Sequence, residues 1–182
     1  MKTLNPIKFS LVATAMFLLA GCASVSDSGT GSTAAQNSNQ LIVPDERIGS
    51  FQLGMSDKDL FKLGVPYQAK PFNQWTVYFY TGIKIFVDNN THNVVFVEVH
   101  GDKSYHTSDG LRIGSQLVDV EKAMGPPDSI QGNSFFGNAP VNLKYKSGNL
   151  EFGFGRYGGS MADSPGNSVT SISIQTPGTG LF

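Results

Sequence analysis

The strongest constraint on the fold of this 182-residue chain is a phrase that it contains twice. Residues 53–66 read LGMSDKDLFKLGVP, and residues 113–127 read IGSQLVDVEKAMGPP. Both phrases end in Gly-x-Pro, after a one-residue insertion in the second. An internal repeat of this kind indicates one structural unit that occurs twice. The equivalent pairs are Gly54 and Gly114, Asp59 and Asp119, Lys62 and Lys122, Gly64 and Gly125, and Pro66 and Pro127.

Each phrase predicts a short helix. Ser56 can cap the first helix, with Asp59 three residues later at the spacing of a capping box. Leu60 and Leu63 are three residues apart, so we expect both to face inward. Gly64 and the proline after it are typical of a helix end. Because helices this short are unstable alone, each must pack on other structure.

Runs with the alternation of β-strands follow each phrase. Turn signals separate them, Thr81-Gly82 above all. We therefore predict an α+β fold, a tandem repeat of a short helix plus a three-stranded antiparallel meander, with the helices packed on one face of a curved sheet. The expected strands are 75–80, 83–88 and 94–100 in the first copy, and 141–146, 150–154 and 168–175 in the second.

Composition excludes several classes of protein. Only 15% of the residues are charged and 21 are glycine, which argues against a coiled coil or a charge-driven disordered chain. The formal net charge is −1 and lysine and arginine do not cluster, so we expect no nucleic-acid partner.

The N-terminus has the features of a secretory signal. Lys2 and Lys8 precede an apolar run at 11–20 that is too short to span a bilayer. The run ends in Leu-Ala-Gly-Cys, which resembles a bacterial lipobox, and Cys22 is the only cysteine of the chain. We expect residues 1–21 to be removed and Cys22 to carry acyl chains such as palmitate, which anchor the protein to a membrane. The alternative is an ordinary cleaved signal beside an incidental cysteine.

The remaining chain divides into three parts. Residues 22–40 are small and polar after Cys22, and we expect a disordered tether. The first helix-plus-sheet repeat then covers 41–106, and the second repeat with a C-terminal tail covers 107–182.

The phrase Gly-Met-Ser-x-x-Asp-Leu-x-x-Leu-Gly-x-Pro at 54–66 resembles the SmpA/OmlA family of bacterial outer-membrane lipoproteins. That family includes the small lipoprotein of the β-barrel assembly machinery. The tandem arrangement is similar to the β-lactamase-inhibitor-protein fold. The resemblance implies a periplasm-facing outer-membrane lipoprotein if the organism is Gram-negative. In lipoproteins that resemble this one, Asp after the lipidated cysteine favours retention in the inner membrane. Ala23 stands at that position here, so the resemblance again implies the outer membrane.

Candidate chemical sites are few. His100, Asp102 and His106 could meet a metal, but their spacing fits no tight pair and favours solvated linker residues. Residues 153–158 match a dinucleotide fingerprint, yet no helix follows to bind a pyrophosphate, so a glycine-rich hairpin loop is favoured. The acids of the two phrases, Asp57, Asp59, Asp119 and Glu121, are explained by helix N-termini. We therefore expect no catalytic residue, no metal and no cofactor, and predict that the protein is not an enzyme.

The first predicted sheet carries unusually many aromatic residues. Alternation places Trp75, Val77 and Phe79 with Ile83, Ile85 and Val87 on the face that meets the helix. The opposite face then carries Tyr78, Tyr80 and Phe86, with Phe96 or a neighbour according to register. Tyr and Phe are frequent anchors of protein interfaces, so we predict that these four bind a partner. They could instead be covered by the tether, the tail or a loop at 133–138. The corresponding face of the second copy is polar, with Asn142, Lys144, Lys146 and Glu151.

These observations favour a non-enzymatic envelope lipoprotein that binds another envelope protein through its sheet face, in a scaffold or assembly role. One alternative is a periplasmic inhibitor of a hydrolase such as lysozyme or β-lactamase. Another is a small-ligand binder or enzyme that uses the loop at 153–166.

Overall fold

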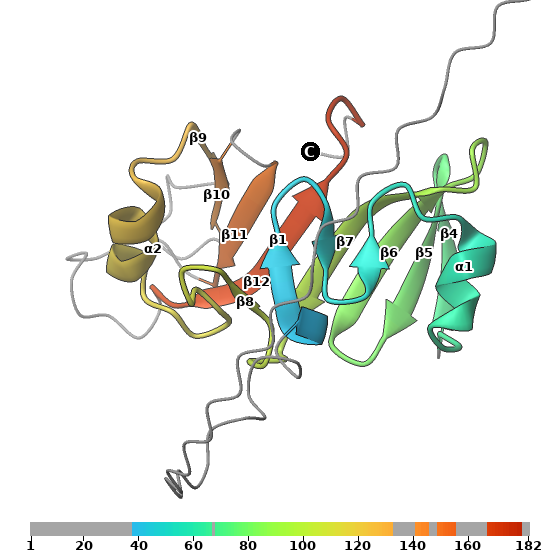
Figure 1. The fold of residues 1–182 in the computed structure, drawn as a ribbon. Coiled ribbons are helices and arrows are strands. Elements are labelled where there is room, and N and C mark those ends of the chain that lie inside the picture. The colour runs from blue at the N-terminus through green and yellow to red at the C-terminus, as the bar shows by residue number, and fades with distance from the viewer. Residues whose placement is uncertain (1–37, 67, 133–140, 146–148, 156–166, 180–182) are drawn as a thin grey trace, which may run out of the picture. The chain divides into compact units, whose positions relative to one another are not determined.

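The computed structural model describes residues 38–66, 68–132, 141–145, 149–155 and 167–179. This part is mainly β-structure, with an eight-stranded sheet, a four-stranded sheet and two short α-helices (Figure 1). The predicted α+β class, built from helices and three-stranded meanders, is therefore wrong. The sequence pattern missed the short and exposed strands, which turn the two predicted meanders into one wide sheet and add a second sheet.

The large sheet is antiparallel throughout. All six predicted strands are confirmed to within two residues, and the unpredicted strands β4 and β9 form its two edges. In spatial order the strands are β4 (Gln68–Phe72), β5 (Trp75–Tyr80), β6 (Ile83–Asp88), β7 (Val94–His100), β12 (Val169–Gln175), β11 (Leu150–Phe154), β10 (Val141–Tyr145) and β9 (Ser129–Gly132).

The small sheet has the order β3-β2-β1-β8, and its β1–β8 pair is parallel. A 3-10 helix, η1 (Ser38–Gln40), leads into it. The sequence predicts a tether through residue 40, whereas residues 38–40 form this 3-10 helix. The strands are β1 (Leu41–Val43), β2 (Arg47–Ile48), β3 (Phe51–Gln52) and β8 (His106–Thr107).

The two repeated phrases form the helices α1 (Asp57–Lys62) and α2 (Leu117–Met124), as predicted. The hydroxyl of Ser56 accepts a hydrogen bond from the backbone N–H of Asp59 at 3.2 Å, which confirms the predicted N-cap. Leu60 is buried but Leu63 is exposed, against expectation. The helix ends at Lys62, so Leu63 is already the C-cap and its side chain leaves the buried face.

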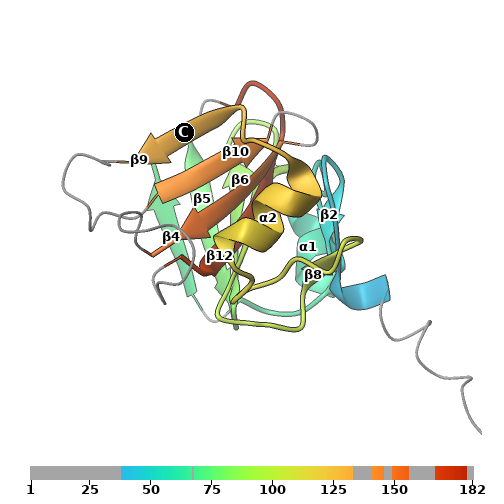
Figure 2. The same cartoon turned by 90° about the vertical axis from the view of Figure 1, so that its left-hand side faces the viewer.

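One face of the large sheet forms the main core. Ile42 and Ile48 of the small sheet, Leu60 of α1, and Leu117 and Val120 of α2 all belong to the same buried cluster as strand residues of that face. Figure 2 shows both helices and the small sheet on this one side of the large sheet. A separate aromatic cluster belongs to the second face, which the helices do not cover.

Among the described residues, no helix is both long and apolar enough to cross a membrane.

Candidate functional site

The register of β5 and β6 divides the four aromatic residues predicted to bind a partner. Val77 lies opposite Phe86, and Tyr78 lies opposite Ile85. Odd-numbered residues of β5 therefore share a face with even-numbered residues of β6. Tyr78 and Tyr80 pack against the main core, whereas Phe86 and Phe96 cluster with Trp75 and Val77 on the second face. The predicted common face is wrong because the antiparallel register of β5 and β6 reverses the parity of their numbering across the turn.

Tyr78 and Tyr80 connect α1 to the sheet. The ring of Phe61 meets that of Tyr78 edge-on, with 5.4 Å between centroids. The Tyr80 hydroxyl donates to the carbonyl oxygen of Gly64 at 3.4 Å. Partial burial raises the pKa of both tyrosines. These contacts account for both tyrosines as structural residues.

The second face of the first half is an aromatic floor with one exposed ring. Phe72 of edge strand β4 stacks on Trp75, with centroids 6.2 Å apart and planes inclined by 18°. Trp75 meets Phe86 at 6.3 Å, and Phe86 meets Phe96 at 5.1 Å, both edge-on. Trp75, Phe86 and Phe96 are buried, whereas Phe72 is 52% exposed. We call Phe72 with these three residues the aromatic floor.

A charged row crosses the same face beside the aromatic floor. Each residue of the row lies directly opposite the next one on the neighbouring strand. In order across β6, β7, β12, β11 and β10, the residues are Lys84, Glu98, Ser173, Glu151 and Lys144. Lys84 Nζ lies 2.7 Å from Glu98 Oε1, and Lys144 Nζ lies 3.6 Å from Glu151 Oε2. Each lysine thus neutralises a glutamate of its own half of the sheet. The polar alternation of the second half indicated Lys144 and Glu151, but the whole row could be found only from the β7–β12 register.

Glu151 is the most deeply buried charge of this row, with 8% of its side chain exposed. Burial raises its pKa, against the opposing effect of Lys144, and the neighbouring charge of Glu98 adds to the rise. A hydrogen bond from Asn142 acts in the opposite direction. Glu151 and Lys144 also line a hollow of about 130 Å³, which has room for a few water molecules or a small ion.

Glu151→Gln should reduce the loss of stability that the wild-type protein undergoes as pH rises from acid to neutral. Because the folded-state pKa is raised, the stability contributed by protonated Glu151 is fully present below about pH 4.5, the ordinary pKa of a glutamate. The wild-type protein loses this stability as pH rises through the folded-state pKa of Glu151. The glutamine side chain of the variant does not titrate, so the variant has no such loss. Thermal unfolding between pH 3.5 and 8 measures the difference.

Asp59→Asn is the control, because Asp59 contributes a pH dependence of stability of the opposite sign. Lys62 and Ser56 lower the pKa of Asp59, so its contribution is present at neutral pH and lost as pH falls through the folded-state pKa. A Glu151→Gln curve that stays parallel to wild type from pH 3.5 to 8 would contradict the assignment.

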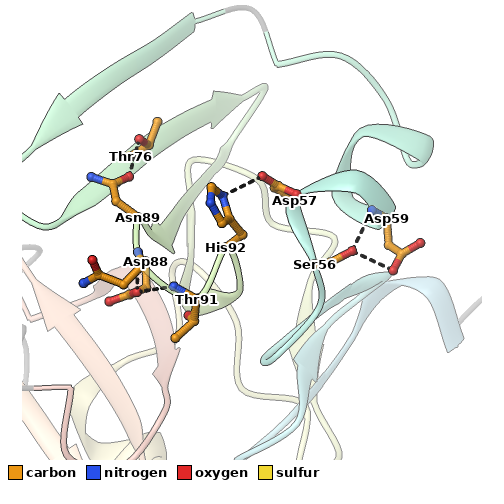
Figure 3. A network of polar contacts seen from close by, with 9 residues as sticks. Ser56, Asp57, Asp59, Thr76, Asp88, Asn89, Thr91 and His92 are labelled. Carbon is orange, nitrogen blue, oxygen red and sulfur yellow. Dashed lines mark hydrogen bonds and ion pairs between the residues drawn. The ribbon is translucent and has the colours of Figure 1, made fainter.

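The acids of the first phrase belong to a network that joins α1 to the β6–β7 turn (Figure 3). His92 Nδ1 lies 3.2 Å from Asp57 Oδ2, and Asp59 is held by the Ser56 hydroxyl at 2.8 Å. In the turn, the Asp88 carboxylate accepts hydrogen bonds from the backbone N–H groups of Asn90 and Thr91. His92 has φ 57°, so it takes the left-handed conformation that this turn needs. The network is a structural connection that fixes the N-terminus of α1.

The other candidates from the sequence do not converge. Asp102 accepts from the backbone and hydroxyl of Ser104, and His106 Nδ1 lies 3.0 Å from the carbonyl oxygen of Thr107. His100 Nδ1 is 3.9 Å from Glu98 Oε1. The described residues contain no group of three possible metal ligands. Of the match at 153–158, only 153–155 are described, and Cys22 and Lys146 also lie outside the described residues.

Comparisons with known proteins leave the family open. No family model and no curated protein match the chain. A cysteine-rich secretory protein from Staphylococcus aureus subsp. aureus Mu50 is similar in structure, with 18% identity and a TM-score of 0.45 over 74% of this chain and 47% of that one. A DUF4309 family protein from Bacillus subtilis subsp. subtilis str. 168 has 13% identity and a TM-score of 0.46, over 72% of this chain and 88% of that one.

This chain therefore spans about half the length of the staphylococcal protein. The resemblance to the SmpA/OmlA lipoproteins stays a prediction that rests on the repeated phrase and on Cys22.

Proposed function

We propose that this protein is a lipid-anchored, non-enzymatic envelope protein that binds another envelope protein through the second face of its large sheet. The anchor is Cys22, and the binding surface is centred on Phe72. The observation that carries the proposal is the exposed Phe72 ring, supported by the three buried rings of the aromatic floor.

The aromatic floor has the make-up of an interface hot spot. Binding energy concentrates in a few aromatic residues whose position is fixed before the partner arrives. Trp75 holds the Phe72 ring by stacking, and Phe86 meets the same ring edge-on at 6.2 Å. Little side-chain entropy would be lost when a partner covers this ring.

Charged groups surround the aromatic floor and can set specificity. Lys70 Nζ lies 5.8 Å from the centre of the Phe79 ring, and Lys84 Nζ lies 5.9 Å from that of Phe86. Strand β4 also contains Pro71, and lysine or proline in an edge strand opposes the addition of another strand. The partner is therefore expected to bind through side chains on the face.

The test is photo-crosslinking in cells with benzoylphenylalanine at position 72. We expect a discrete protein adduct, and we expect Phe72→Ala to lower capture of the same partner at least 10-fold, because an anchor residue contributes about 2 kcal/mol or more. Ile130 is the matched control, since it is 51% exposed on the opposite edge strand β9. The same probe at position 130 should yield no such adduct.

Equal adducts at 72 and 130, or none at 72, would sink this proposal. A Phe72→Ala variant that remains folded at the temperature of the capture experiment shows that any loss of capture is not a loss of fold.

A further inference from the structure

A second exposed apolar surface lies at α1, on the side of the molecule opposite to the aromatic floor. Phe61, Leu63 and Val65 are 43%, 45% and 88% exposed. They are three of the six large apolar side chains that are exposed in the described part of the chain, and they lie within five residues of one another. We call these three residues the α1 patch.

The equivalent helix α2 lacks this patch. The residues of the second phrase that correspond to Phe61, Leu63 and Val65 are Glu121, Ala123 and Pro126. Both helices bury the corresponding residues Leu60 and Val120 in the main core. The helix-plus-Gly-x-Pro phrase therefore folds without large apolar residues at the positions of Leu63 and Val65. The exposed part of the Phe61 ring adjoins them, while the rest of that ring packs edge-on against Tyr78 at 5.4 Å.

The surroundings of the α1 patch suit a lipid surface. Lys58 lies one turn before Phe61, and Lys62 follows Phe61 directly, so long cationic side chains flank the apolar ones. The neighbouring acids are paired at the surface, Asp57 with His92 at 3.2 Å and Asp59, whose side chain is 54% exposed, with Lys62 at 2.7 Å. Apolar side chains beside lysines are typical of segments that enter the headgroup region of a bilayer, where lysine extends to the surface.

We propose that the α1 patch inserts into the surface of the membrane that carries the Cys22 anchor. The proposal rests on the lipid anchor of the proposed function, and it uses a different surface from Phe72. Only residues 23–37 separate Cys22 from η1, and a coil of that length has a typical reach of about 20–25 Å. The bilayer is thus always near, so a weak contact through three side chains suffices.

The test uses the lipidated full-length mature protein in vesicles of phosphatidylethanolamine and phosphatidylglycerol at 3:1. Because Cys22 is the only cysteine and its sulfur carries the lipid, Val65→Cys introduces the only free thiol for a bimane label. We expect a blue shift of bimane emission and strong quenching by brominated lipids. Val118→Cys is the matched control, an exposed apolar position on α2 that should show neither.

Phe61→Glu with Leu63→Ala transfers the α2 residues to α1, and it should lower quenching at position 65 at least threefold. Circular dichroism checks that this variant remains folded. Equal quenching at 65 and 118, no quenching at 65, or a protein adduct from a photoprobe at 65 would each overturn the proposal.

The two proposals fail separately. Loss of the Phe72 adduct with quenching retained at 65 would refute only the partner surface. An adduct at 72 without quenching at 65 would refute only membrane insertion.

Discussion

Cys22→Ser is expected to abolish incorporation of an alkyne-labelled fatty acid completely and to leave residues 1–21 attached to the chain. The wild-type protein should carry the label and begin at residue 22. Within the lipobox-like sequence Leu-Ala-Gly-Cys, the thiol of Cys22 is the only nucleophilic side chain that can accept a diacylglycerol. Since no second cysteine exists, no other thiol can replace it.

The same variant should lose its detergent-phase partitioning. Each buried CH₂ of an acyl chain contributes about 0.8 kcal/mol to membrane binding, so two or three chains make the difference nearly all-or-none. Ala23→Asp is the control, because it changes the residue after the cysteine and should leave the label in place. An unlabelled wild-type protein that nevertheless begins at residue 22 or later would favour the cleaved signal with an incidental cysteine.

The features that could be predicted from the sequence are those with local causes. The capping residue Ser56 and the glycine near the end of each phrase predict both helices, because the groups that begin and end a helix are close in sequence. The Thr81-Gly82 turn predicts the β5–β6 hairpin for the same reason. These elements were found with their boundaries nearly correct.

The strands that were missed lack the alternation of buried strands. Every residue of β4 and β9 is exposed, and β4 contains Pro71. The strands of the small sheet have only two or three residues each. The small sheet is held by Ile42 and Ile48, which pack in the main core, and β4 and β9 are held by backbone pairing to β5 and β10. A local pattern records neither, and this is why the predicted fold class is wrong.

The candidate site depends on register more than on residue type. Alternation along each strand predicts Tyr78 and Phe86 on one face, but the register places Phe86 opposite Val77 and Tyr78 opposite Ile85, so the two rings lie on different faces. Glu98 and Ser173 are neighbours in the charged row although 75 positions separate them. Local patterns find the residues that line a sheet face, but only the long-range pairing of β7 with β12 shows which of them meet.

Phe152→Ala is expected to be the most destabilising single substitution among those considered for this fold. Phe152 is fully buried in β11, and its ring meets that of Tyr145 edge-on at 5.9 Å. Its neighbours across the sheet are Leu143 and Ile172, which are also buried. Truncation removes the apolar contacts of the ring and leaves a cavity that a sheet paired on both sides cannot close, at a cost of about 3–5 kcal/mol.

A loss of that size corresponds to a fall in Tm of roughly 10 °C or more for a domain of this length. Phe72→Ala is the matched control, because it removes the same ring from a half-exposed edge position and should shift Tm by only a few degrees. The contrast separates the two roles of phenylalanine in this protein. If Phe152→Ala unfolded no earlier than Phe72→Ala, β11 would not be part of the main core, and the eight-stranded sheet that supports both proposed surfaces would have to be abandoned.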